Sequence, residues 1–186
     1  IARLDLNGEL VYDDVYSSEY SRNAFCNDML VYNENIYITG SLVSETSNTD
    51  VLTINWNSDG GVSWLSIFDG SGKIDDAGVS LAVTNELFVV ASNCQADDSN
   101  IECIAYDIDE GLQMWNIFYE AEGGFNEFVT ELTINFNGDI VILGHSTHAE
   151  SEFSNILLLN IGQEFELADY FHEIDSLMVH NIPNDF

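Results

Sequence analysis

Proline and positive charge are both nearly absent from this chain of 186 residues. The single proline is Pro183, so turns between secondary-structure elements must be built from Gly, Asn and Asp. Arg3, Arg22 and Lys73 face 33 acidic residues, which gives a formal net charge of −30. Such a field repels phosphate groups, so we expect neither nucleic acid nor an anionic membrane surface as a partner.

Long apolar segments and helical periodicity are missing too. No apolar run approaches the roughly 20 residues of a membrane-spanning helix, so we expect no direct insertion into a membrane. Apolar residues nevertheless make up 46% of the chain, which predicts a folded core rather than disorder. The chain begins at Ile1 and shows no signal peptide, which we interpret as a mature product or an excised segment.

Cysteines are few, and none belongs to a CxxC pair or to a Cys/His cluster with zinc spacing. Cys94 ends one expected strand and Cys103 lies early in the next, so an antiparallel hairpin could bring them face to face. We therefore expect a disulfide between Cys94 and Cys103, which would stabilise the fold by about 2–3 kcal/mol through loop closure. Cys26 lies in an expected strand and is interpreted as a free, buried thiol.

An internal repeat dominates what is present. Turn glycines recur at spacings of 52, 51 and 51 residues, at Gly8, Gly60, Gly111 and Gly162. Eight residues after each glycine comes an aromatic residue: Tyr16, Phe68, Tyr119 and Tyr170. A second landmark is an apolar run that ends in a small residue, at Gly40, Ala91 and Gly144. Two interleaved sets of landmarks with one period establish the repeat.

Each repeat reads as four short strands, and a unit of this size matches one blade of a β-propeller. We therefore predict an all-β fold, a β-propeller built from four-stranded antiparallel blades of about 51 residues. A single domain, or a segment of one, spans 1–186: a partial blade at 1–17, complete blades near 24–69, 77–119 and 128–172, and a partial blade at 176–186. We favour a segment of a longer array of blades, and closure as a four-bladed ring is the alternative.

Large aromatic residues fall on the expected outermost strand of each repeat. Trp64 and Phe68 occupy this strand in one repeat, and Trp115 and Tyr119 in the next. Rings of this size can fill the gap that widens between adjacent blades, which we favour over a role in ligand stacking. Asn or Asp recurs near the start of each repeat, at Asn23, Asp76 and Asn126, and we expect these residues to cap loops or bridge blades.

The repeat resembles the SBBP-type, or seven-bladed, β-propeller repeat family of secreted and surface proteins of bacteria. The resemblance rests on the Asp5-Leu6-Asn7-Gly8 turn, the aromatic strand up to Tyr16, Asn23-Ala24, and the strand Asn35–Gly40, with a second copy from Ser58 to Ala91. It covers nearly the whole chain and weakens after Gly162. The resemblance implies a propeller fold and an extracellular or cell-surface location, and it implies no particular activity.

Calcium is the one metal that the acidic residues suggest. Carboxylates gather in the long loops, where Asp75, Asp76, Asp97, Asp98, Glu120 and Glu122 form a candidate cation site. The stretches Asn55–Gly60 and Asp107–Gly111 also resemble half of a calcium loop, but ordinary turn chemistry explains Asn, Asp and Gly at these positions as well. The acidity equally suits a saline medium.

The loops also provide the candidate binding residues. Tight turns are expected on one side of the repeats and long acidic loops on the other, where function concentrates on a rigid scaffold. A binding role predicts exposed aromatic residues in those loops, and the candidates are Tyr20, Phe125 and Phe153. Packing of these rings beneath their own loops is the alternative.

We expect a non-catalytic extracellular scaffold that binds protein or glycan at the cell surface through these loops, with self-assembly as a further possibility. A structural subunit of a surface filament is one alternative, and a propeller enzyme acting on polysaccharide is another. No nucleophile elbow, phosphate loop or Ser/His/Asp signature is present, so we expect no enzyme activity.

Overall fold

The computed structural model of the chain consists of strands and turns, without a helix among the residues that it describes. Those residues are 2–13, 15–16, 23–43, 48–70, 75–84, 86–95, 99–121, 125–148, 154–162 and 177–182, the last stretch as backbone only. The prediction of an all-β fold is confirmed. In the described part of the chain, no segment forms a helix that could span a membrane.

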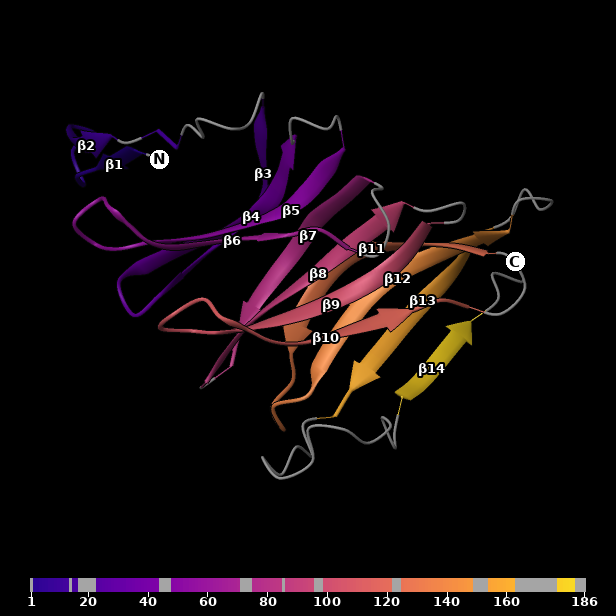
Figure 1. Cartoon of the computed structure of the whole chain (residues 1–186). Coiled ribbons are helices and arrows are strands. Elements are labelled where there is room, and N and C mark those ends of the chain that lie inside the picture. Colours follow the sequence, from indigo (N-terminus) through magenta and orange to yellow (C-terminus); the bar gives the residue numbers. More distant parts are fainter. Residues whose placement is uncertain are drawn as a thin grey trace.

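Three four-stranded antiparallel sheets follow one another along the described chain, and a two-stranded hairpin precedes them (Figure 1). The hairpin pairs β1 (Ala2–Leu4) with β2 (Leu10–Asp13). The first sheet contains β3 (Ala24–Tyr32), β4 (Asn35–Val43), β5 (Thr49–Trp56) and β6 (Val62–Phe68). The second contains β7 (Asp75–Val83), β8 (Leu87–Gln95), β9 (Ser99–Asp107) and β10 (Gln113–Tyr119). The third contains β11 (Phe125–Ile134), β12 (Ile140–His148), β13 (Ser154–Ile161) and β14 (Leu177–Ile182).

The fourth strand of the third sheet differs from the sequence prediction. We expected residues 165–172 in this place and 176–186 as the start of another blade. The structure instead pairs Leu177–Ile182 with β13 in antiparallel register, from Ile161↔Leu177 to Ile156↔Ile182. An apolar stretch of six residues fits either place, so local pattern alone could not decide between them. Residues 165–172 lie outside the described part.

Side chains of Asn and Asp fix the turns between the third and fourth strands. Oδ1 of Asn57 accepts hydrogen bonds from the amides of Asp59 and Gly61, both at 3.0 Å. Oδ1 of Asp107 accepts in the same way from Asp109 at 3.0 Å and Glu110 at 2.7 Å. The turn interpretation of these two stretches is confirmed, because their oxygens serve the backbone of the turn itself.

The first strand of each four-stranded sheet carries a β-bulge at the same place. The pairing of β3 with β4, β7 with β8 and β11 with β12 each shifts by one residue, at Asn27, Val79 and Thr130. The pairs before the bulges are Cys26↔Gly40, Gly78↔Ser92 and Val129↔Gly144, and each contains one glycine. A Cβ at Gly40 or Gly144 would collide with the carbonyl oxygen of Phe25 or Phe128. The spacing of the sequence landmarks matched Ala91 with Gly40 and Gly144, but the strand registers place Ser92 at the position of these two glycines.

The first and second sheets pack face to face around an aromatic cluster. Trp64 of β6 meets Phe88 edge-on, with ring centroids 5.8 Å apart, and lies 6.2 Å from the ring of Tyr106. Its Nε1 donates a hydrogen bond at 3.1 Å to the carbonyl of Ile108, in the turn between β9 and β10 of the second sheet. The prediction that outer-strand aromatic rings fill the space between units is confirmed at Trp64.

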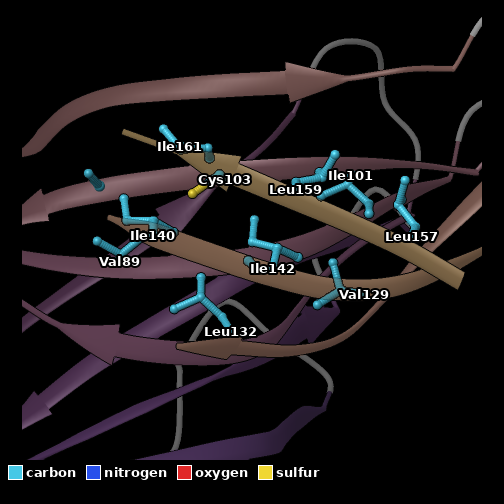
Figure 2. Packing of buried hydrophobic residues seen from close by; sticks show 12 residues of the cluster. Val89, Ile101, Cys103, Val129, Leu132, Ile140, Ile142, Leu157, Leu159 and Ile161 are labelled. Atoms are coloured by element: carbon cyan, nitrogen blue, oxygen red, sulfur yellow. The ribbon is translucent and has the colours of Figure 1, made fainter. Parts of the chain in front are cut away.

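The second and third sheets enclose the larger apolar core (Figure 2). Side chains from β8 and β9 interlock there with side chains from β11, β12 and β13. The buried members include Ile101, Cys103, Val129, Ile140, Ile142, Leu157 and Leu159. Trp115 and Tyr119 of β10 are partly buried against this cluster, again as expected for outer-strand aromatic residues. Packing on both faces explains the continuous apolar run of β8, which is buried from Phe88 to Ser92, whereas buried and exposed residues alternate along β12.

Polar side chains connect the first strands of neighbouring sheets. Oδ2 of Asp28 accepts hydrogen bonds from the Leu81 amide at 2.9 Å and from Oγ of Ser80 at 3.1 Å. Ser80 Oγ in turn accepts a hydrogen bond from the Leu132 amide at 3.1 Å. Asp28 directly follows the bulge of β3, and Ser80 directly follows the bulge of β7. The same kind of hydrogen bond, from a backbone amide of the next sheet to the side chain after the bulge, therefore joins the first sheet to the second and the second to the third. These bonds hold β3, β7 and β11 side by side.

The N-terminal hairpin packs on the first sheet as the first sheet packs on the second. A Cβ at Gly60 would lie 3.1 Å from the ring of Tyr12, and a Cβ at Gly111 would meet the ring of Trp64. Tyr12 also has the same place in its strand pair as Trp64. Tyr12 lies opposite Arg3 and Trp64 lies opposite Asn55, and each of these pairs stands next to the register shift between its two strands. The hairpin therefore corresponds to the third and fourth strands of a sheet.

Candidate functional site

The sheets have two unlike edges. At the turn edge, where first and third strands end, the described connections are short and include Asn33-Glu34, whose φ angles of 48° and 67° form a tight hairpin turn. At the loop edge, where first and third strands begin, carboxylates collect from several strands: Asp50, Asp69, Asp75, Asp76 and Glu120. The predicted tight turns are confirmed at the turn edge in the described residues, whereas most of the predicted acidic loops lie outside them. The carboxylates at the strand ends make the loop edge the candidate site.

Two of the predicted metal ligands have structural roles at the loop edge. Oδ1 of Asp75 accepts a hydrogen bond from the Thr49 amide of the first sheet at 2.8 Å, and Oδ2 of Asp76 accepts one from the Gly70 amide at 2.8 Å. Glu120 is exposed at the end of β10. Asp97, Asp98 and Glu122 lie outside the described residues. Within the described part, no group of three or more potential ligands is placed to hold a metal ion.

Asn126 and Asp75 bridge neighbouring sheets in the same way. Oδ1 of Asn126 accepts a hydrogen bond from the Ser99 amide at 2.8 Å, as Oδ1 of Asp75 does from Thr49. For Asn126 we expect a loop cap or a bridge between units, and the bridging role is confirmed. In the second sheet the bridging residue is Asp75, and the predicted residue Asp76 caps the preceding loop through the Gly70 amide. Asn23 contributes its backbone carbonyl, which accepts a hydrogen bond from the Val43 amide at 2.8 Å.

Neighbouring carboxylates at the loop edge raise the pKa values of Asp50 and Asp76. Burial raises the pKa of Asp50, and the negative charges of Asp69, Asp76 and Asp75 raise it further. Burial also raises the pKa of Asp76, more than the hydrogen bond from Gly70 lowers it. A cation or a basic side chain placed here would relieve this mutual repulsion.

A buried polar network lies next to this edge within the second sheet. The Cys94 thiol donates to Oε2 of Glu102 at 3.2 Å, and the amide of Asn116 donates to Oε1 of the same carboxylate. Burial raises the pKa of Glu102 despite these two bonds. Sequence reasoning missed this group, although a lone Glu in the apolar strand IECIAY was a signal that a partner had to exist.

The predicted disulfide between Cys94 and Cys103 is wrong, since both residues are free thiols. In the pairing of β8 with β9, Cys103 lies opposite Ala91 and Cys94 lies opposite Asn100. Cys94 lies three positions after Ala91 in β8, and side chains an odd number of positions apart point to opposite faces, so the two thiols lie on opposite faces of the sheet. Cys103 joins the core with the third sheet, and Cys94 faces Glu102. Cys26 is free as predicted, but it is exposed rather than buried.

Phe125 is the one predicted binding aromatic that falls in the described residues. It begins β11 at the loop edge and is half-buried, and its ring meets His148 edge-on with centroids 5.0 Å apart. Tyr20 and Phe153 lie outside the described residues. The sequence matches no protein-family model and no curated protein.

Proposed function

We propose that this chain is part of a β-propeller and acts as a non-catalytic scaffold that binds a protein partner through its acidic loop edge. The propeller architecture is supported by the contacts between β3, β7 and β11, since first strands that gather along one line are typical of blades around an axis (Figure 1). The SBBP-like repeat supports a secreted or cell-surface setting for such a scaffold.

The observation that carries the binding role is the fixed position of carboxylates at the loop edge. Backbone amides from neighbouring segments anchor Asp75 and Asp76, so the exposed carboxylate of Asp75 is presented on a rigid base, while Asp76 is buried beneath the edge. The charge of −30 favours a partner that carries lysine or arginine, and it accelerates the encounter with such a partner. Among the candidate partners, a basic protein therefore fits better than a neutral glycan.

The test is a titration of the chain with a deca-lysine peptide, read by calorimetry at low salt. Asp69 and Glu120 are exposed at the loop edge, whereas Asp59 and Glu110 are exposed at the turn edge. Asp69→Asn/Glu120→Gln should raise the dissociation constant by about fivefold, as expected for two exposed ion pairs. Asp59→Asn/Glu110→Gln, with the same change of net charge, should have a smaller effect. Equal weakening by both variants would mean a diffuse field without a site and would reject the proposal.

A further inference from the structure

The outermost strand of the second sheet, β10, has one side along which no described strand pairs. It stands at the end of the strand order β10-β9-β8-β7 and pairs only with β9 in the described part of the chain. Every second residue of an edge strand turns its N–H and C=O groups away from the sheet, where another extended chain can pair with them. Because the first and third sheets pack on the two faces of the second, this edge belongs to a unit with both neighbours present.

The features that usually protect an edge strand are few in β10. Lysine, proline, inward-facing charges and bulges keep edge strands from pairing with other chains. The sequence of β10 (QMWNIFY) contains no charged residue and no proline, in a chain with 33 acidic residues. A register shift between Gln113 and Trp115 disturbs the beginning of the strand, but the pairing with β9 then continues without irregularity to Tyr119. This second part of β10 is therefore suited to accept a further strand.

Apolar side chains are accessible on this strand. Phe118 is 46% exposed, and Leu112, directly before β10, is 59% exposed. On the other face of the strand, Trp115, Ile117 and Tyr119 are only partly buried against the core shared with the third sheet. An added strand would place its side chains beside both rows, and aromatic residues pair favourably with β-branched residues across strands. The edge therefore favours a segment rich in valine, isoleucine or threonine.

Carboxylates flank this uncharged strand at both ends. Glu110 precedes β10 at the turn edge and Glu120 follows it at the loop edge, and both are exposed. These charges attract an added strand that carries lysine or arginine on both sides of its apolar part. A second copy of this chain fits less well, because it brings another net charge of −30.

We infer that β10 binds an extended segment of another protein as a fifth strand of the second sheet, and that this segment carries β-branched residues flanked by lysine or arginine. Backbone hydrogen bonds give such a contact its affinity, while Phe118 and the two flanking carboxylates select the sequence of the segment. The inference rests on the proposed function for the basic character of the partner. It adds a second contact, of which only Glu120 lies at the loop edge.

The test is a calorimetric titration with the peptide Lys-Lys-Thr-Val-Thr-Val-Thr-Lys-Lys in about 0.15 M sodium chloride. The control is the same peptide N-methylated on its three central residues, which keeps the charge and the side chains but removes backbone donors along both of its edges. The unmethylated peptide should bind about tenfold more tightly, because the control loses several backbone hydrogen bonds. It should also slow amide hydrogen exchange in residues 113–119. Equal affinity of the two peptides would overturn the inference.

Phe118→Asp separates strand pairing from simple charge attraction. The added negative charge attracts a basic peptide more strongly, whereas aspartate is a poor strand residue and removes the ring beside the edge. Strand pairing therefore predicts that Phe118→Asp weakens binding of the unmethylated peptide by about fivefold. Phe136→Asp, the same change at a turn residue that is 97% exposed, should not weaken it. Equal effects of the two variants would reject β10 as the site.

Failure of this inference can be told apart from failure of the proposed function. If deca-lysine distinguishes the two edges but the methylated and unmethylated peptides bind alike, only the added strand is rejected. If the two peptides differ but deca-lysine does not distinguish the edges, the contact at β10 stands and the loop edge is rejected. A thermal melt checks that Phe118→Asp is folded, and the comparison of the two peptides on the unaltered chain decides the inference if it is not.

Discussion

The carboxylate of Asp28 in β3 accepts a hydrogen bond from the backbone amide of Leu81 in β7 at 2.9 Å, across the boundary between two sheets. The same oxygen accepts from Oγ of Ser80, which itself binds the amide of Leu132 in the third sheet. One acidic side chain therefore sets the register of the first sheet on the second, at the point where the first strands meet.

Replacement of Asp28 by alanine should destabilise the fold by about 1.5–3 kcal/mol, the usual range for hydrogen bonds to a charged group. The loss arises because the Leu81 amide is left without its acceptor. Urea unfolding followed by tryptophan fluorescence measures it, with Asp59→Ala in an exposed turn as the control. If both variants unfold at the same urea concentration, the Asp28 contact does not stabilise the stack.

Gly78→Ala should destabilise the contact between the first and second sheets by about 1–3 kcal/mol through overpacking. A Cβ at this position would meet Oγ1 of Thr39 in the first sheet, whereas a Cβ at Gly61 would have its nearest neighbour at 3.4 Å. Gly61→Ala is therefore the matched control for urea unfolding. Thr39→Ala in the Gly78→Ala background should recover part of the loss, and simple additivity of the two losses would contradict the steric explanation.

Stability should fall as the pH rises above the ordinary pKa of a glutamate, 4.5, because burial raises the pKa of Glu102 in the folded chain. The folded state then holds more protons than the unfolded state, so the stabilisation is fully present below that pH and is lost as the pH passes through the raised pKa. Burial raises the pKa of Asp76 and of Asp50 in the same direction.

Glu102→Gln isolates this effect. The variant should gain stability relative to the unaltered chain between pH 5 and pH 8, because its neutral amide has no charge to desolvate; a tenfold difference in proton affinity between the folded and unfolded states corresponds to about 1.4 kcal/mol. Glu120→Gln, an exposed change of the same charge, should alter stability by a nearly constant amount over this range. Urea unfolding at several pH values measures both, and parallel curves for the two variants would argue against a buried Glu102 with a raised pKa.

Thiol titration should find one reactive cysteine in the native chain and three after denaturation without a reductant. Cys26 is exposed, whereas Cys94 and Cys103 are buried in the folded state. Burial and the nearby Asp28 carboxylate raise the pKa of Cys26, so its reaction should be slower than that of a free cysteine. A single thiol after denaturation would restore the Cys94–Cys103 disulfide and exclude the observed strand register.

Calcium should raise the melting temperature no more than sodium chloride of the same ionic strength does. Asp75 and Asp76 already serve backbone amides, which leaves screening as the main effect of added cations. A bound metal would instead stabilise the fold by about 3 kcal/mol at a hundredfold excess over its dissociation constant. Melts in EDTA, in calcium and in matched salt distinguish the two, and a calcium-specific rise would restore the predicted cation site.

The spacing of landmarks determined the strands, the repeat and the two unlike edges, because each depends on local chemistry. Alternation and apolar runs specify strands, and Asn57 and Asp107 close their own turns whatever surrounds them. Trp64 could be placed between units for a similar reason, since a large ring on an outer strand has few other places to be buried.

Tertiary structure decided what depends on register between distant segments. The thiols of Cys94 and Cys103 lie on opposite faces of the second sheet because β8 and β9 pair in a register that puts Cys103 opposite Ala91. The two strand sequences alone do not determine this register. The network around Glu102 exists because Asn116 of β10 lies beside it in the sheet, and the alignment of Ser92 with Gly40 follows from the bulges. The place of Leu177–Ile182 was also settled by pairing with β13, since an apolar strand accepts either of two neighbours until the rest of the sheet selects one.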